Sequence, residues 1–205
     1  VHLDKAHHTL FQGKIRDYIL VALLGIAAGG LVALFLWLPD NLLWDFSYFA
    51  SDTYVFWMLT TSLVILFSTK RYIAAIKAGV YVFLLFLITT AFQSLRPFYS
   101  GSYTPFASVG EMAAPSIGGW LWYSIFPAIV CVVLSFILWG ARKNTHFGKL
   151  FLFVPLAFLA VETLYLLYCI FAYQTKLFSS LTNIACIGVY CFIIKRFLAM
   201  KQNND

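Results

Sequence analysis

The stretch YILVALLGIAAGGLVALFLWL, residues 18–38, establishes the fold class of this 205-residue chain. It carries no charged residue, and its length falls in the range of roughly 17–25 residues that a helix needs to cross a hydrocarbon core of about 30 Å. The stretch is longer than the apolar part of a signal peptide, and the LWLPDN that ends it is no small-residue cleavage site. We therefore predict a retained transmembrane helix after a polar cytoplasmic segment, residues 1–17.

The whole chain has the composition of a membrane protein. Hydrophobic residues make up 62% of it and charged residues 11%, whereas soluble domains are about half apolar and about a quarter charged. The chain therefore predicts an all-α, polytopic bundle of six transmembrane helices in the lipid bilayer, at approximately 18–38, 53–69, 72–92, 119–140, 149–173 and 177–197. A long outer loop, 93–118, and a cytoplasmic tail, 198–205, complete the predicted organisation.

The basic residues divide unequally between the two sides of this six-span arrangement. Twelve of the fourteen Lys and Arg residues fall on one side, and only Arg96 and Lys176 fall on the other. By the positive-inside rule, both termini are cytoplasmic, which predicts a multi-pass protein of the cytoplasmic membrane, typical of a bacterial inner membrane. The net charge of +6 is then a signal of topology that also suits anionic lipid, and no nucleic-acid partner is predicted.

One acidic residue, Glu162, lies near the middle of the fifth window, roughly 18 Å from either end at 1.5 Å per residue. A carboxyl group at that depth costs about 2.5 kcal/mol or more unless it is paired, protonated or hydrated, so it indicates either a functional site or a packing contact. Lys77 is a candidate ion-pair partner, with snorkelling to the interface as the alternative. The spacing places on the same helix face Pro155, Phe158, Tyr165 and Cys169.

A second group of candidate residues lies on the predicted outer side, where acids alternate with aromatic side chains. Such a group forms either an interfacial aromatic belt or a binding site for a planar or cationic small molecule. The predicted ligand-binding residues, in addition to Glu162 and Tyr165, are Trp44, Asp45, Asp52, Trp57, Arg96, Tyr99, Tyr103, Glu111 and Trp120.

The sequence shows no catalytic, metal or cofactor motif. The four histidines lie outside the apolar windows, which argues against haem ligation inside the bundle. The four cysteines lie inside the windows without a C-x-x-C pair, a pattern typical of buried free thiols. H-E-x-x-H and G-x-S-x-G motifs are missing, so catalytic activity is not predicted. An intramembrane enzyme acting on lipid, with Glu162 and Tyr165 as acid–base groups, is the least favoured alternative.

Gly25, Gly29 and Ala33 are spaced four residues apart and form a small-residue strip along the first helix. Such strips let two helix backbones approach closely in a membrane, where the hydrophobic effect does not drive association. The strip predicts helix docking, either within this chain or onto a second protein.

The GIAAGGLVA segment (residues 25–33), the six windows and the aromatic, acidic outer loops together resemble the substrate-binding subunits of energy-coupling-factor vitamin transporters. This resemblance implies binding of a small molecule from the outer side, and docking of the first helix on a membrane partner subunit. The chain is also similar to uncharacterised six-span bacterial membrane proteins, a resemblance that implies no activity. The alternative function is a non-catalytic accessory protein, such as a subunit or an immunity factor, that acts through the strip.

Overall fold

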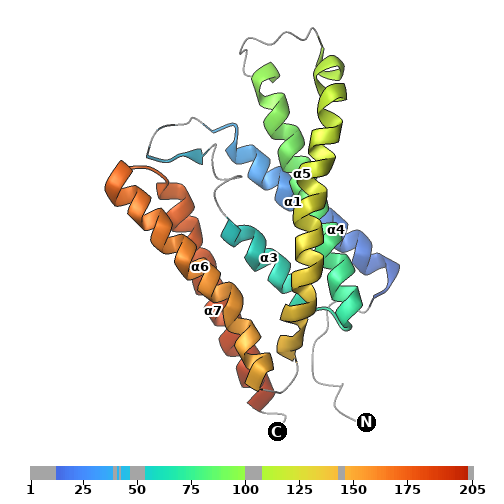
Figure 1. Ribbon diagram of the computed structural model, residues 1–205, viewed down its shortest axis with the longest axis vertical. Coiled ribbons are helices and arrows are strands. Elements are labelled where there is room, and N and C mark those ends of the chain that lie inside the picture. Colours follow the sequence, from blue (N-terminus) through green and yellow to red (C-terminus); the bar gives the residue numbers. More distant parts are fainter. Residues whose placement is uncertain are drawn as a thin grey trace.

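The computed structural model describes residues 13–38, 41, 43–46, 54–99, 108–142 and 146–202, and the regular secondary structure of these residues is helical (Figure 1). The helices, in chain order, are α1 (Ile15–Phe35), α3 (Tyr54–Leu66), α4 (Arg71–Tyr99), α5 (Val109–Leu138), the short 3₁₀ helix η2 (Trp139–Arg142), α6 (His146–Tyr173) and α7 (Leu177–Gln202). This confirms the predicted all-helical fold class.

Five of the described helices are long and apolar enough to cross a bilayer, namely α1, α4, α5, α6 and α7. The remaining window, 53–69, contains α3, which has 13 residues. At 1.5 Å per residue α3 is about 20 Å long, shorter than a hydrocarbon core of about 30 Å. It ends early because the polar residues after Leu66 form a turn, in which the Ser68 hydroxyl donates to the carbonyl of Val64 (2.7 Å). The described residues thus contain five membrane-length apolar helices and the shorter α3, and the count of six spans stays a prediction.

The short helix α3 lies at the centre of the bundle. It contacts α4, α5, α6 and α7, and most of its side chains are buried. Trp57 of α3 stacks on Phe86 of α4 with ring centroids 4.4 Å apart, and Leu59 and Ile65 pack in a cluster with Tyr190 of α7. These contacts make α3 the element around which the long helices are arranged.

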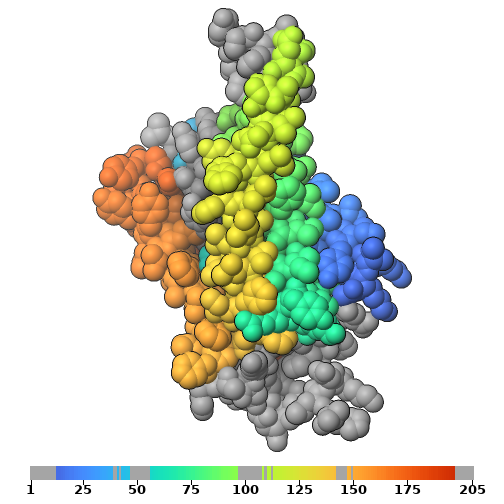
Figure 2. Space-filling model, turned by 45° about the vertical axis from the view of Figure 1, so that its right-hand side comes forward, coloured from blue at the N-terminus to red at the C-terminus, as the bar shows by residue number. Residues whose placement is uncertain are grey.

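Helices α4 and α5 form a hairpin that is longer than predicted. They contain 29 and 30 residues, or about 44 Å each at 1.5 Å per residue, and their upper ends stand beyond α1 and the α6–α7 pair (Figures 1 and 2). Much of the predicted outer loop 93–118 is therefore helical. The start of α5 had a recognisable signal in the sequence: Ser108 is three residues before Glu111, and its hydroxyl accepts a hydrogen bond from the Glu111 N–H (3.3 Å).

The small-residue strip of α1 packs against α4 of the same chain. A Cβ atom added to Gly25 would lie 2.7 Å from the carbonyl oxygen of Tyr81, and one added to Gly29 would lie 2.6 Å from that of Leu85. Ala33 is buried as well, and the Thr89 hydroxyl lies 3.4 Å from the Gly29 carbonyl oxygen that it bonds. Only glycine allows the two backbones to approach this closely, so the strip makes an intramolecular helix contact.

A buried ion pair joins the beginnings of α1 and α4. Lys77 is fully buried, and its Nζ lies 3.5 Å from Oδ2 of Asp17, which is 17% exposed. The same carboxylate oxygen accepts hydrogen bonds from the backbone N–H groups of Gly13 (2.8 Å) and Lys14 (3.2 Å), while the Lys77 ammonium also lies over the Tyr18 ring. In the structure Lys77 pairs with Asp17 and not with Glu162, and because Asp17 lies in the first turn of α1, this position is compatible with the snorkelling alternative.

Candidate functional site

The predicted outer residues do not form one cluster in the part of the chain that the structure describes. Trp44 and Asp45 lie beside the start of α7, where the Leu177 N–H donates to the Leu43 carbonyl (3.0 Å). Arg96 and Glu111 belong to the protruding α4–α5 hairpin, which Figure 1 shows well apart from residues 43–46. Of the described candidates, Trp44 and Asp45 thus lie in one segment, and Arg96 and Glu111 lie in another.

The remaining outer candidates differ in their surroundings. Trp57 is buried in the core against Phe86 and does not face the outer rim. Trp120 is half-buried on α5, and its indole N–H is buried without a hydrogen-bond partner. Tyr99 ends α4, and its side chain is outside the described set. Asp52 and Tyr103 lie outside the described residues.

Glu162 is half-buried on α6, within electrostatic range of the Cys186 thiol on α7. The face that α6 buries is lined by Leu152, Leu159, Leu166 and Cys169, so Glu162 lies at its edge. Of the residues predicted to share its face, Pro155 and Cys169 are buried, whereas Phe158 and Tyr165 are more than half exposed. Tyr165 instead lies beneath the Lys176 ammonium, 5.4 Å from its ring centroid, and points away from the bundle core.

A group of buried polar side chains on α7, which we call the α7 polar cluster, was not recognised in the sequence. Ser179, Ser180 and Asn183 are at most 1% exposed, and none of their side-chain polar atoms has a hydrogen-bond partner. Both the amide nitrogen and the amide oxygen of Asn183 are unpaired. The signal was the segment SSLTN, residues 179–183, in which four of five residues are polar inside an apolar window.

The α7 polar cluster lies within the membrane-spanning length of its helix. Asn183 is six residues from the first residue of α7, about 9 Å along the axis at 1.5 Å per residue. The unpaired hydroxyl of Thr61 is buried on the neighbouring helix α3. Burying an amide without a hydrogen bond costs roughly 2–7 kcal/mol, and hydrocarbon supplies no compensating water. Among the described residues the cluster thus has buried polar atoms without hydrogen-bonding partners.

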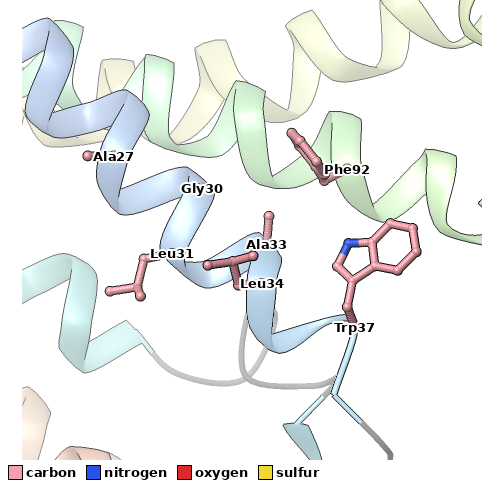
Figure 3. Close-up of a pocket in the computed structure, with 7 residues that line it drawn as sticks. All are labelled: Ala27, Gly30, Leu31, Ala33, Leu34, Trp37 and Phe92. Atoms are coloured by element: carbon pink, nitrogen blue, oxygen red, sulfur yellow. The ribbon is translucent and has the colours of Figure 1, made fainter.

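Figure 3 shows a concave feature elsewhere, an open apolar groove of about 450 Å³ at the C-terminal half of α1. Six of its lining residues come from α1 and the turn after it, and Phe92 of α4 approaches Trp37 at one end. The groove has almost no polar lining, so it lacks the convergent polar groups that orient a small ligand. It is better suited to lipid or to another helix than to a polar molecule.

Among the residues with described positions, no three His, Cys, Asp or Glu side chains gather as a metal site would require. All four cysteines are free: Cys169 and Cys186 are buried, Cys131 is half-buried and Cys191 is exposed. No protein-family model, curated protein or solved structure matches the chain.

Proposed function

We propose that this protein is an integral membrane protein that binds a small polar molecule inside its helical bundle, at the α7 polar cluster. The observation that carries the proposal is Asn183, whose side chain is fully buried with both amide atoms unpaired. A bound molecule would supply the missing hydrogen bonds. Transport of that molecule, as part of a multi-component transporter, is the corresponding physiological role.

The chemistry of the cluster favours a ligand that both donates and accepts hydrogen bonds. An amide offers two donor hydrogens and two acceptor lone pairs, and each serine hydroxyl offers one donor and two lone pairs. Cys186 lies three residues after Asn183, on the same face of α7. The charge of Glu162 on α6 acts on the Cys186 thiol, so Glu162 faces this part of α7. Glu162 is then placed to neutralise a protonated amine on the ligand or to exchange a proton during transport.

Access from the outer side is part of the same proposal. With α3 counted as a short second crossing, the unequal distribution of basic residues supports a cytoplasmic-membrane protein with both termini inside, which puts the beginning of α7 at the outer surface. The Leu177–Leu43 hydrogen bond holds the segment that contains Trp44 and Asp45 against that end of α7. In the same segment, Phe46 packs on Phe178 with ring centroids 4.8 Å apart. This segment lies where a molecule would enter towards Ser179 and Asn183.

Substituting Asn183 with leucine tests the proposal because a binding amide and a merely unpaired amide predict different results. If the amide binds a molecule, Asn183→Leu abolishes that binding. If the amide is merely unpaired, leucine of similar size removes its desolvation cost and stabilises the protein by about 1–3 kcal/mol. We expect mass spectrometry of the purified wild-type protein to detect a small molecule that is missing from the variant, without a gain in thermal stability.

Thr182→Val is the matched control on the same helix. The Thr182 hydroxyl already donates to the Phe178 carbonyl (2.9 Å), so its loss is expected to leave the co-purified molecule in place. A more stable Asn183→Leu protein whose extract is identical to the wild type would contradict the proposed site.

A second candidate function, docking to a membrane partner subunit, is supported by the free face of α1. The strip of Gly25 and Gly29 is covered by α4, but a Cβ atom at Gly30 would have nothing within 4 Å. Gly30 and Ala27 lie in the open groove of Figure 3, where small residues leave room for another helix.

Gly30→Leu tests this second function. We expect the substitution to fill the groove and to remove any partner that co-purifies from native membranes, while the fold is unchanged. Gly188→Leu is the matched control, because Gly188 is also exposed with nothing within 4 Å but lies on α7. A partner retained by Gly30→Leu, or lost equally from both variants, would exclude docking through the groove.

A further inference from the structure

A second cavity, of about 140 Å³, lies between α3, α5 and α6. Helix α3 forms its floor with Met58, Ser62 and Ile65. The walls come from α5 and α6, and their lining residues are Cys131, Leu134, Ile137, Leu138, Phe151, Val154, Pro155 and Phe158. The α7 polar cluster is not part of this cavity.

The lining selects for hydrocarbon. It contains no charged side chain, and Ser62 supplies its one hydroxyl. An apolar cavity of about 150 Å³ remains dry in other proteins and takes up benzene-sized apolar molecules. This cavity therefore accommodates an apolar chain, and it has nothing to bind a headgroup.

The cavity is continuous with the lipid-facing surface of the bundle. Its outer wall includes Leu134, Ile137, Val154 and Phe158, which are 44–63% exposed on apolar membrane-length helices. Helices α5 and α6 contact each other at few positions, and the cavity lies between them. A chain in the bilayer has direct sideways access to α3.

We infer that this cavity binds an acyl chain of a bilayer phospholipid, inserted between α5 and α6 until it reaches α3. The headgroup remains at the membrane surface, because the cavity offers it no polar partner. The chain completes the packing of α3 against two helices that barely contact each other. This inference is independent of the small-molecule site on α7.

Photolabelling in reconstituted membranes tests the inference. The full-length protein is placed in phosphatidylcholine nanodiscs with a small fraction of lipid carrying a diazirine on its acyl chain, irradiated, digested and mapped by mass spectrometry. We expect adducts on α3 at Met58, and on Cys131, in addition to those on exposed residues such as Val161 and Phe171. Because α3 is surrounded by other helices, its labelling requires that a chain enters the cavity.

Cys131→Trp fills the cavity and is expected to reduce the Met58 adduct to background. Val133→Trp is the matched control, since Val133 is 58% exposed on the opposite side of α5 and should leave that adduct unchanged. Should Cys131→Trp fail to fold, Val154→Trp fills the cavity from the α6 side. An unlabelled α3 beside labelled Val161 and Phe171, or a Met58 adduct that persists in a folded filled variant, would overturn the inference.

Discussion

Gly29→Ala is expected to destabilise the protein by about 3 kcal/mol, the upper part of the usual range for overpacking a well-packed contact. The new methyl group would lie 2.6 Å from the carbonyl oxygen of Leu85 and 2.9 Å from Cβ of Ile88. The first of these atoms belongs to the helix backbone and the second is the first atom of a side chain, so neither can rotate away. Helix α1 must therefore move away from α4, and the contact between the two helices is lost along the length of α1. Equilibrium unfolding in mixed micelles measures the change.

The adjacent glycine provides the control for this experiment. Gly30 faces open space, so Gly30→Ala introduces no clash and removes a flexible residue from a helix, a change worth roughly 0.5–1 kcal/mol in favour of the folded state. The two variants alter composition identically and differ only in which face receives the methyl group. Equal stability of Gly29→Ala and Gly30→Ala would show that α1 does not pack on α4 through this strip.

Removing the Asp17 carboxylate has the second large expected effect. Lys77 is fully buried, and Asp17→Ala leaves its ammonium without the carboxylate that lies 3.5 Å away. Breaking a fully buried pair by deleting one partner costs about 3–5 kcal/mol, and because this pair is partly buried we expect a smaller loss of about 2 kcal/mol. The substitution also frees the backbone N–H groups of Gly13 and Lys14, which now donate to Asp17. We expect a loss of this size in unfolding measurements.

Substituting the other partner, Lys77, distinguishes the contribution of the ion pair from the loss of a packing contact. Lys77→Met leaves Asp17 with its two backbone donors and its partial exposure, so it should cost less than Asp17→Ala. The double variant should be more stable than Asp17→Ala alone, since it no longer buries the Lys77 ammonium away from the Asp17 carboxylate. Additive losses in the double variant would indicate that the two side chains do not interact.

Much of the fold was predictable because lipid imposes a simple rule on chain segments. A segment long and apolar enough to cross the bilayer must satisfy its backbone hydrogen bonds internally, so it forms a helix. The windows 18–38, 149–173 and 177–197 accordingly lie largely within α1, α6 and α7. The hairpin lengths were underestimated because helices need not end at the membrane surface, where capping by Ser108 rather than hydropathy sets the start of α5.

The candidate site was less predictable, and Asn183 illustrates why. The acidic and aromatic residues were predicted to bind a ligand because of their chemistry, yet Trp57 packs in the core and Tyr165 is exposed. Asn183 belongs to a short polar segment that is unremarkable by composition, and its burial depends on where α7 lies against the bundle. Residue type alone does not indicate whether a side chain faces lipid, a neighbouring helix or a cavity.

The sequence by itself determined that this chain is a helical membrane protein, where most of its helices lie and that α1 has a face suited to close packing. The tertiary structure alone decided that this face packs on α4, that Lys77 pairs with Asp17, and that α3 lies at the centre. In soluble proteins the apolar stripe of a helix identifies its buried face. Helices in lipid are apolar on all sides, so hydropathy does not distinguish the buried face, and only the fit between side chains of different helices selects it.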